Sequence, residues 1–231
     1  HVERFPAVTG SRKRELRQRL GVEEDTFFLL SVGELSGNKN HREIIRLMPE
    51  IKRRLGDRKV LYGICGDGFY RDELAALVEG MGLGGDVALY GYREDIQDYL
   101  ACADCLVFPS VREGLGMAAL EAMAMGIPVV ASDNRGTREY MEDGRNGYVC
   151  DVRRPESFID AIEKVCRMPP EERAAMGEEG RRTAERFDIR SAGRIMDRVY
   201  EAADAQRKPA GEAEARIRYI PTQENSMRKA Q

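Results

Sequence analysis

The chain has 231 residues, of which 42% are hydrophobic and 33% charged, and its formal net charge is −3. This length and composition are typical of a globular protein with one large domain or two small ones. The mild acidic balance argues against a nucleic-acid partner or an anionic membrane surface, and no run of about 18 apolar residues could span a bilayer.

The chain begins with His1 rather than Met, and its first ten residues, HVERFPAVTG, are typical of a segment that leads into a domain. No signal peptide is recognisable there. We expect residues 1–26 to be a linker from an N-terminal domain outside this chain, followed by a helix that leads into the next domain.

Short apolar runs then alternate with amphipathic stretches, which predicts strands separated by helices. The expected strands are residues 27–32, 59–65, 87–90, 105–108, 127–131 and 147–150. The expected helices are residues 41–55, 70–81, 94–101, 117–125 and 155–168. Near-continuous apolar strands with helices between them predict an α/β fold, a doubly wound parallel sheet of the Rossmann-like type, over residues 27–204.

Two more amphipathic helices are expected after residue 168, the first opening with Pro-Pro-Glu-Glu and the second at 189–203. From Gln206 the sequence turns polar, so we expect residues 205–231 to be a flexible tail.

The five cysteines are odd in number and lie in apolar contexts, which favours reduced thiols in the cytoplasm over a disulfide framework. Cys102 and Cys105 have CxxC spacing, but no second pair or nearby histidine completes a zinc site. We interpret both as packing residues.

Glycine-rich or polar turns follow five of the expected strands, beginning at Gly33, Gly66, Gly91, Pro109 and Ser132. In a parallel sheet, ligands bind beyond the carboxyl ends of the strands, where such loops meet. Each turn alone is weak evidence. Together they predict a site for an extended, polar, anionic ligand.

The first of these loops carries Lys39 directly before a helix start, where free N–H groups and the helix dipole favour phosphate. Its spacing does not match a Walker motif. A solvated lysine at a helix cap is the alternative interpretation.

The stretch EGLGMAALEAMAMG begins with Glu113 and carries Glu121 inside an almost wholly apolar helix. Gly114 and Gly116 let the backbone approach a ligand, and a carboxylate at Glu121 could accept two hydrogen bonds from a vicinal diol such as ribose. Alternatively, Glu121 pairs with an arginine or a backbone amide, and Glu113 is an ordinary surface-loop acid.

These residues resemble a known family. Glu113 and Glu121 match the E-x7-E signature of retaining glycosyltransferases with the GT-B fold, family 4, and SVGELSGNKNH, GICGDGFYRDELAALVEGMGL and GIPVVASDNRG agree in order and spacing. The resemblance covers residues 27–148 with specific motifs and residues 2–200 more loosely. SVGELSGNKNH and VASDNRG look most like the bacterial branch that builds exopolysaccharide or capsule.

The resemblance implies the C-terminal half of a GT-B enzyme, which binds a UDP- or GDP-sugar donor without a metal or another cofactor. It implies that Glu121 binds ribose, that Glu113 contacts the donor sugar, and that Lys39 neutralises the leaving diphosphate, with Glu113 and Lys39 as the catalytic pair. The implied donor-binding residues are Gly33, Lys39, Asn40, Gly66, Gly91, Tyr92, Glu113, Gly114, Leu115, Gly116, Met117 and Glu121.

Two departures stand out. Many family members carry an arginine where this chain has Glu34, so Lys39 is left as the single cation of its loop, and we expect Glu34 to point away from a diphosphate. The resemblance also implies an acceptor-binding N-terminal domain with a catalytic histidine, and the only histidines here are His1 and His41. The partners implied are that domain and a lipid-linked or saccharide acceptor, in the cytoplasm or at the inner membrane face.

Two other functions stay open at this point. The chain could be a non-catalytic nucleotide-sugar-binding module that works with a separate acceptor-binding subunit, or a nucleotide-sugar epimerase with GT-B architecture. A dehydrogenase is disfavoured because no GxGxxG follows a strand.

Overall fold

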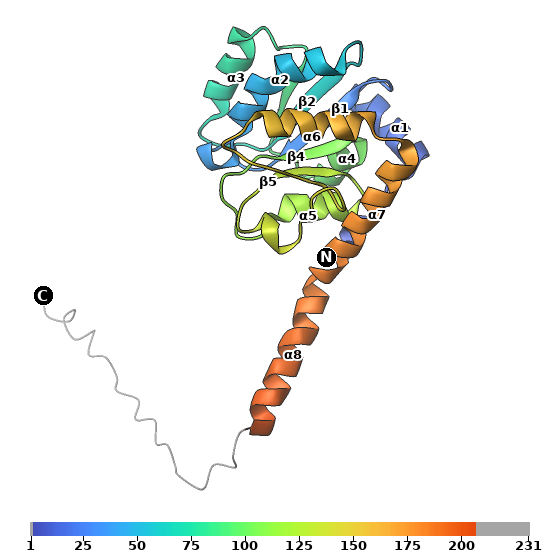
Figure 1. Ribbon diagram of the computed structural model, residues 1–231, viewed down its shortest axis with the longest axis vertical. Helices are drawn as coiled ribbons and strands as arrows, with labels where there is room; N and C mark the ends of the chain where they lie inside the picture. The colour runs from blue at the N-terminus through green and yellow to red at the C-terminus, as the bar shows by residue number, and fades with distance from the viewer. Residues whose placement is uncertain (1, 207–231) are drawn as a thin grey trace, which may run out of the picture. The chain divides into compact units, whose positions relative to one another are not determined.

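The computed structural model describes residues 2–206 (Figure 1). All strand pairs of its six-stranded sheet are parallel, and the strand order is β3-β2-β1-β4-β5-β6. The strands are β1 (Phe27–Val32), β2 (Val60–Cys65), β3 (Val87–Gly91), β4 (Cys105–Phe108), β5 (Val129–Ser132) and β6 (Tyr148–Cys150). The six strands expected from the sequence are therefore confirmed, with ends that differ by one or two residues.

The expected helices are also present. They are α1 (Gly10–Leu20), α2 (His41–Leu55), α3 (Arg71–Gly80), α4 (Ile96–Cys102), α5 (Met117–Ala124), α6 (Glu156–Arg167), α7 (Pro170–Arg186) and α8 (Ile189–Gln206). Three short 3₁₀ turns complete the described part, η1 (Val2–Arg4), η2 (Gly37–Lys39) and η3 (Thr137–Glu139). Residues 2–192 lie within one compact unit, and residues 207–231 of the tail predicted at 205–231 lie outside the described residues.

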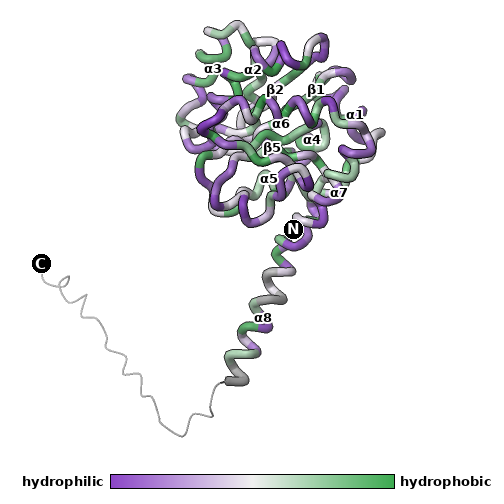
Figure 2. The backbone as a smooth tube through the Cα atoms, viewed as in Figure 1, coloured by the Kyte–Doolittle hydropathy of each residue, from purple (hydrophilic) through white to green (hydrophobic). Residues whose placement is uncertain are grey.

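Helices cover both faces of the sheet. On one face, Leu16 of α1, Leu100 of α4 and Met123 of α5 belong to one buried apolar cluster. On the other face, a second cluster contains α2, α3 and α6 side chains such as Ile45 and Ile162. Figure 2 shows the strands, made of apolar residues, inside and segments of hydrophilic residues around them. This is the doubly wound α/β architecture that the sequence predicted.

Helix α2 shows how the sequence produces this packing. Its buried apolar residues Ile44, Ile45, Met48, Ile51 and Leu55 recur at helical spacing, so they form one stripe that faces the sheet. Full burial of each such side chain contributes about 1.5–3 kcal/mol. The chain leaves the helix at Gly56, where φ is 63°.

The strand order places a crevice at one position of the sheet edge. From β1 the chain builds outward through β2 and β3, and then returns to the other side of β1 and builds outward through β4, β5 and β6. The loops after β1 and β4 therefore leave in opposite directions. Ligands of doubly wound sheets bind in the crevice at such a switch point.

A buried ionic cluster fixes α1 against the sheet. The Asp104 carboxylate accepts hydrogen bonds from Lys13 Nζ (2.7 Å), Arg17 Nη2 (2.6 Å) and the Phe28 amide (2.9 Å). The Arg17 guanidinium also donates to the carbonyl oxygens of Cys102 and Thr26. Every charge is thus paired, which offsets the cost of its burial.

The structure also tests the predictions that Cys102 and Cys105 are packing residues and that no segment spans a membrane. Cys102 and Cys105 are buried and free, so their interpretation as packing residues is confirmed. Burial raises the pKa of the Cys102 thiol to about 11. Among residues 2–206, no helix is both long and apolar enough to cross a lipid bilayer.

We predict that Asp104→Ala lowers the free energy of unfolding by about 3–5 kcal/mol, because Arg17 and the Phe28 amide would remain buried without their partner. Urea denaturation measures this loss. Glu15→Ala is the control on α1, the helix that the cluster holds, since the pair of Glu15 with Arg12 is exposed and is expected to contribute less than about 0.5 kcal/mol. A loss below about 1 kcal/mol for Asp104→Ala would contradict the role given to this cluster.

Candidate functional site

Two of the predicted site residues meet across the crevice between β1 and β4. Lys39 follows β1 and Glu113 follows β4, and they are 74 positions apart in the chain. Lys39 Nζ donates a hydrogen bond to Glu113 Oε1 at 2.6 Å, with the two side chains 21% and 12% exposed. The Lys39 ammonium also lies 5.3 Å from the centre of the Phe108 ring. Neither a solvated lysine nor an ordinary surface acid describes this arrangement.

Asn38 holds the two loops together. Its backbone oxygen accepts from the Val111 amide at 2.8 Å, its Oδ1 accepts from the Arg112 amide at 3.1 Å, and its Nδ2 donates to the Arg112 oxygen at 3.0 Å. These three bonds join the residue before Lys39 to the residues before Glu113. The sequence analysis missed Asn38, because its partners lie 73 and 74 positions away.

The loops after β1, β2 and β3 touch through glycine backbone. A Cβ on Gly66 would lie 1.8 Å from the Gly33 carbonyl oxygen, so no other residue fits at position 66. The Gly66 amide donates to the Gly91 oxygen at 2.8 Å, and the next residue, Tyr92, is 75% exposed. The structure thus brings these predicted residues to one edge of the sheet.

Two helices begin at this edge without a side-chain cap. Asn40, with φ 56°, precedes α2, and Gly116, with φ 83°, precedes α5, and neither helix has a side chain bonded to its first amides. Uncapped N–H groups and the positive dipole end of a helix favour an anion. Met117, the first residue of α5, is exposed.

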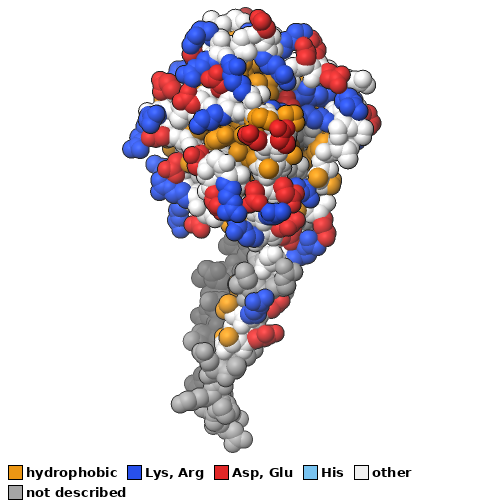
Figure 3. Space-filling model, turned by 45° about the vertical axis from the view of Figure 1, so that its right-hand side comes forward, with side chains coloured by type: hydrophobic (Ala, Val, Ile, Leu, Met, Phe, Trp, Pro, Cys, Tyr) orange, Lys and Arg blue, Asp and Glu red, His pale blue; other side chains and the backbone are white. Residues whose placement is uncertain are grey.

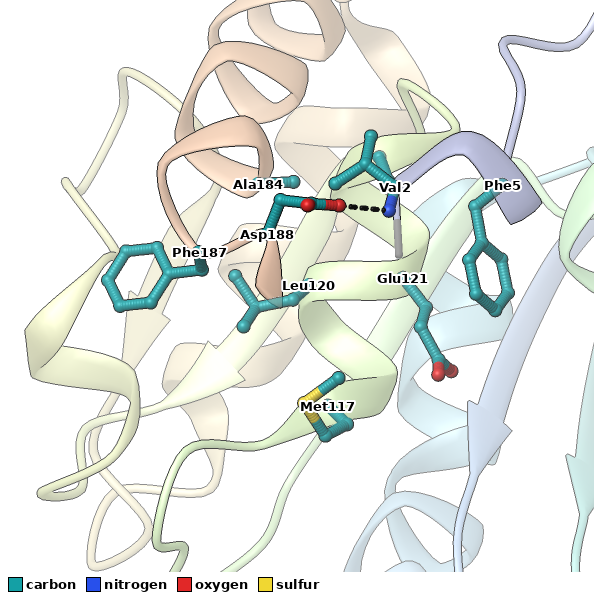
Figure 4. Close-up of a pocket in the computed structure, with 9 residues that line it drawn as sticks. Val2, Phe5, Met117, Leu120, Glu121, Ala184, Phe187 and Asp188 are labelled. Atoms are coloured by element: carbon teal, nitrogen blue, oxygen red, sulfur yellow. Dashed lines mark hydrogen bonds between the residues drawn. The ribbon is translucent and has the colours of Figure 1, made fainter. Parts of the chain in front are cut away.

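Glu121 lies one turn into α5 and is half-buried. It lines a cavity with Met117 and Leu120 of α5 and with Val2 and Phe5 of the N-terminal segment (Figure 4). Burial raises the pKa of its carboxyl group. The Arg4 charge opposes this rise in pKa. Within residues 2–206, Glu121 makes no hydrogen bond or ion pair, so the direct pairing with an arginine or an amide that the sequence left open is not present among these residues.

The two glutamates of the E-x7-E pattern do not contact each other. Glu113 lies before the turn, where its backbone packs on Gly136, and Glu121 lies beyond it on the helix. Burial and the Glu113 charge raise the pKa of the Tyr140 hydroxyl, and that hydroxyl donates to the Gly116 oxygen at 3.4 Å. Glu113 and Glu121 therefore occupy two different positions along this edge of the sheet.

The remaining polar residues of the first loop have separate positions. Glu34 is exposed. His41 is buried beside the backbone of Gly33 and Glu34, and burial and the Lys39 charge lower its pKa to about 4, so its ring is neutral at pH 7. Within the described residues, neither of its ring nitrogens has a hydrogen-bond partner of normal geometry.

A second polar cluster supports the loop after β4. Asn134 Nδ2 donates to the Ser110 oxygen at 3.1 Å, and Thr137 Oγ1 donates to the Ser132 oxygen at 2.7 Å. These side chains are buried at the ends of β4 and β5. The sequence analysis quoted the turn at Ser132 but did not assign this supporting role, which depends on contacts between two loops.

Comparison with known proteins identifies the family. The family model described as "Glycosyl transferases group 1" matches residues 12–183. The chain belongs to this family. The resemblance found in the sequence is therefore confirmed.

Similar proteins include a putative glycosyltransferase, EpsD, of Bacillus subtilis, which is 35% identical over 202 residues, 87% of this chain and 52% of EpsD. The alpha-D-kanosaminyltransferase of Streptomyces kanamyceticus is 32% identical over 84% of this chain and 50% of its own length. The chain thus spans about half the length of the curated relatives it matches.

Among solved structures, HepE of Anabaena in complex with UDP and glucose superimposes with a TM-score of 0.76 at 25% identity, over 86% of this chain and 54% of HepE. HepE has also been crystallised with UDP-glucose. WaaG, a glycosyltransferase involved in lipopolysaccharide biosynthesis, gives a TM-score of 0.67 at 26% identity, over 80% of this chain and 52% of WaaG. The predicted fold class, that of GT-B glycosyltransferases, is confirmed.

We predict that Gly116→Ala lowers the free energy of unfolding by about 1–2 kcal/mol or more, since a side chain at φ 83° is strained. Its Cβ would also lie 2.9 Å from the Phe108 ring and from the Tyr140 hydroxyl. Gly114→Ala is the matched control in the same turn, because nothing lies within 4 Å of its Cβ. Equal stabilities of the two variants in urea would show that the turn does not need the left-handed conformation.

Proposed function

We propose that this chain is the C-terminal, donor-binding domain of a retaining glycosyltransferase. The complete enzyme transfers a hexosyl group from a nucleoside diphosphate sugar to an acceptor hydroxyl, and the anomeric configuration is kept. The observation that carries the proposal is the meeting of Lys39 and Glu113 at the switch point, beside the uncapped start of the helix that bears Glu121. This edge of the sheet, which we call the rim, thus offers the Lys39 cation, helix N–H groups and the carboxylates of Glu113 and Glu121 to one extended ligand.

Each group matches a part of that ligand. Glu121 has a carboxylate without a partner among the described residues and accepts hydrogen bonds from the ribose hydroxyls. The amides of Gly116, directly before α5, and of Met117, its first residue, face the diphosphate, and Glu113 accepts from the sugar hydroxyls. Tyr92, exposed at the end of β3, lies on the nucleobase side.

Charge develops on the diphosphate as the sugar leaves. Lys39 and the N-termini of α2 and α5 stabilise this charge, because preorganised donors and dipoles act without reorganisation at the moment of reaction. We propose that this set acts without a metal. Within residues 2–206, no group of three or more His, Cys, Asp or Glu side chains is arranged to hold a metal ion.

The names of two relatives support a more specific role. EpsD and the lipopolysaccharide core enzyme LpsE of Rhizobium meliloti, 32% identical over 64% of this chain, are both named as glycosyltransferases. We place the enzyme in bacterial surface polysaccharide or glycoconjugate synthesis, with a saccharide or lipid-linked acceptor bound by an N-terminal domain. The five free cysteines fit a reducing compartment such as the cytoplasm.

Titration of this chain with UDP-, GDP- and ADP-sugars tests the proposal. We expect one of these series to raise the unfolding temperature. The free energy of unfolding should increase by about 2.7 kcal/mol when the ligand is at 100 times its Kd. Glu121→Ala is expected to weaken this binding by about 10- to 100-fold, because hydrogen bonds to a charged acceptor contribute about 1.5–3 kcal/mol.

Glu178→Ala is the control, since Glu178 is an exposed helical glutamate of α7 that pairs with Arg182 on the surface. It should bind the same sugar nucleotide as tightly as the wild type does. Binding that is unchanged in Glu121→Ala would remove the ribose role from Glu121. The absence of binding to all three series would contradict the proposed function itself.

A further inference from the structure

The ion pair between Lys39 and Glu113 lies in the crevice where the proposed function puts the diphosphate. Lys39 Nζ and Glu113 Oε1 are 2.6 Å apart, and both side chains are largely withdrawn from solvent. A partly buried pair is screened less than a surface pair. An anion that binds to Lys39 therefore competes with the Glu113 carboxylate, which is already bonded to it.

The pair is held in place from both sides. Asn38 ties its own loop to Arg112, the residue before Glu113. Behind Glu113, a Cβ on Gly136 would lie 2.9 Å from the Glu113 carbonyl oxygen, which shows how closely the next loop packs on it. The backbone of Glu113 is thus held in place on both sides, close to Lys39.

Two ligands place different demands on this pair. A free nucleoside diphosphate ends in a phosphate that carries about −1.5 to −2 charges at neutral pH, and it offers the Glu113 carboxylate no hydrogen-bond donor. When a sugar is esterified to that phosphate, one ionisable oxygen is lost and several hydroxyl donors are gained. Glu113 therefore repels the first ligand and can bond to the second.

We propose that the Lys39–Glu113 pair makes this site select the sugar-loaded nucleotide over the spent nucleoside diphosphate, with Glu113 as the side chain that determines the specificity. This inference rests on the proposed function. In the loaded complex, Glu113 exchanges its bond to Lys39 for bonds to sugar hydroxyls, and Lys39 turns to the diphosphate. After transfer the hydroxyls are gone, and Glu113 takes Lys39 back as the diphosphate leaves.

The test compares the Kd values of UDP and UDP-glucose for the wild-type chain and for Glu113→Gln, by calorimetric titration. This substitution keeps the length of the side chain, removes its charge and replaces one acceptor oxygen with an amide donor. We expect the ratio of Kd for UDP to Kd for UDP-glucose to fall about tenfold in this variant, mainly because UDP binds more tightly. A ratio within twofold of the wild-type value would overturn the inference.

Glu142→Gln is the matched control. Glu142 also pairs at 2.6 Å with a cation, Arg145, but on the exposed surface. We expect it to leave the ratio unchanged. A fall of the same size in this control would mean that loss of any glutamate charge changes the ratio, and would overturn the assignment to Glu113.

A measurement on the wild type needs no variant. The methyl ester of UDP lacks the additional charge of UDP but carries no sugar, so we expect it to bind more tightly than UDP. Tighter binding of UDP than of its ester would overturn the repulsion ascribed to Glu113. If the wild type binds none of the UDP-, GDP- and ADP-sugars or their diphosphates, the proposed function fails and this inference with it, whereas binding with an unchanged ratio overturns the inference alone.

Discussion

Between β1 and β4 the growth of the sheet reverses, and the loops after these two strands leave in opposite directions. The crevice between them is a consequence of chain connectivity. Lys39 enters it from one side and Glu113 from the other, and Asn38 closes the two loops on each other. The glycine contacts among the first three loops and the left-handed start of α5 at Gly116 place the rest of the rim around this point.

The interior makes this rim possible. Two apolar clusters hold helices on both faces of the sheet, and the paired charges of Lys13, Arg17 and Asp104 fix α1 at the end of the sheet opposite the loops. Charged side chains of both signs are mixed over the surface seen in Figure 3, with no large area of a single sign on that face. The net charge of the chain is likewise small, at −3.

Much of this fold could be predicted from the sequence. Apolar runs of four to seven residues between amphipathic stretches predicted all six strands, and α2 was predicted with its observed bounds, 41–55, because its apolar stripe is regular and Gly56 ends it. Strand ends were less certain. The strand expected at 127–131 begins only at Val129, because Pro128 has no amide hydrogen to give to the ladder.

The sequence predicted which residues belong to the site, but it did not predict the contacts between them. The glycine turns and the two glutamates are local patterns, and they indicated which loops line the rim. The bond between Lys39 and Glu113 and the Asn38 bridge join segments more than 70 positions apart. No periodicity or spacing in the sequence encodes such distances.

In the proposed function, ligand binding exchanges one set of hydrogen bonds for another. Glu121 has no hydrogen-bond partner among the described residues and gains bonds from the ligand. Lys39 and Glu113 are bonded to each other and have to give up that bond. In the function that we propose, affinity for the nucleoside part comes from Glu121, and the choice between the nucleotide sugar and the free nucleoside diphosphate comes from the Lys39–Glu113 pair.

A crystal structure of this chain with UDP-glucose or another bound nucleotide sugar tests this exchange most directly. We expect Glu121 oxygens within hydrogen-bond distance of the ribose hydroxyls, Lys39 Nζ on a diphosphate oxygen and Glu113 on the sugar. A ligand bound elsewhere, or bound at the rim with the 2.6 Å contact between Lys39 and Glu113 still in place, would contradict it.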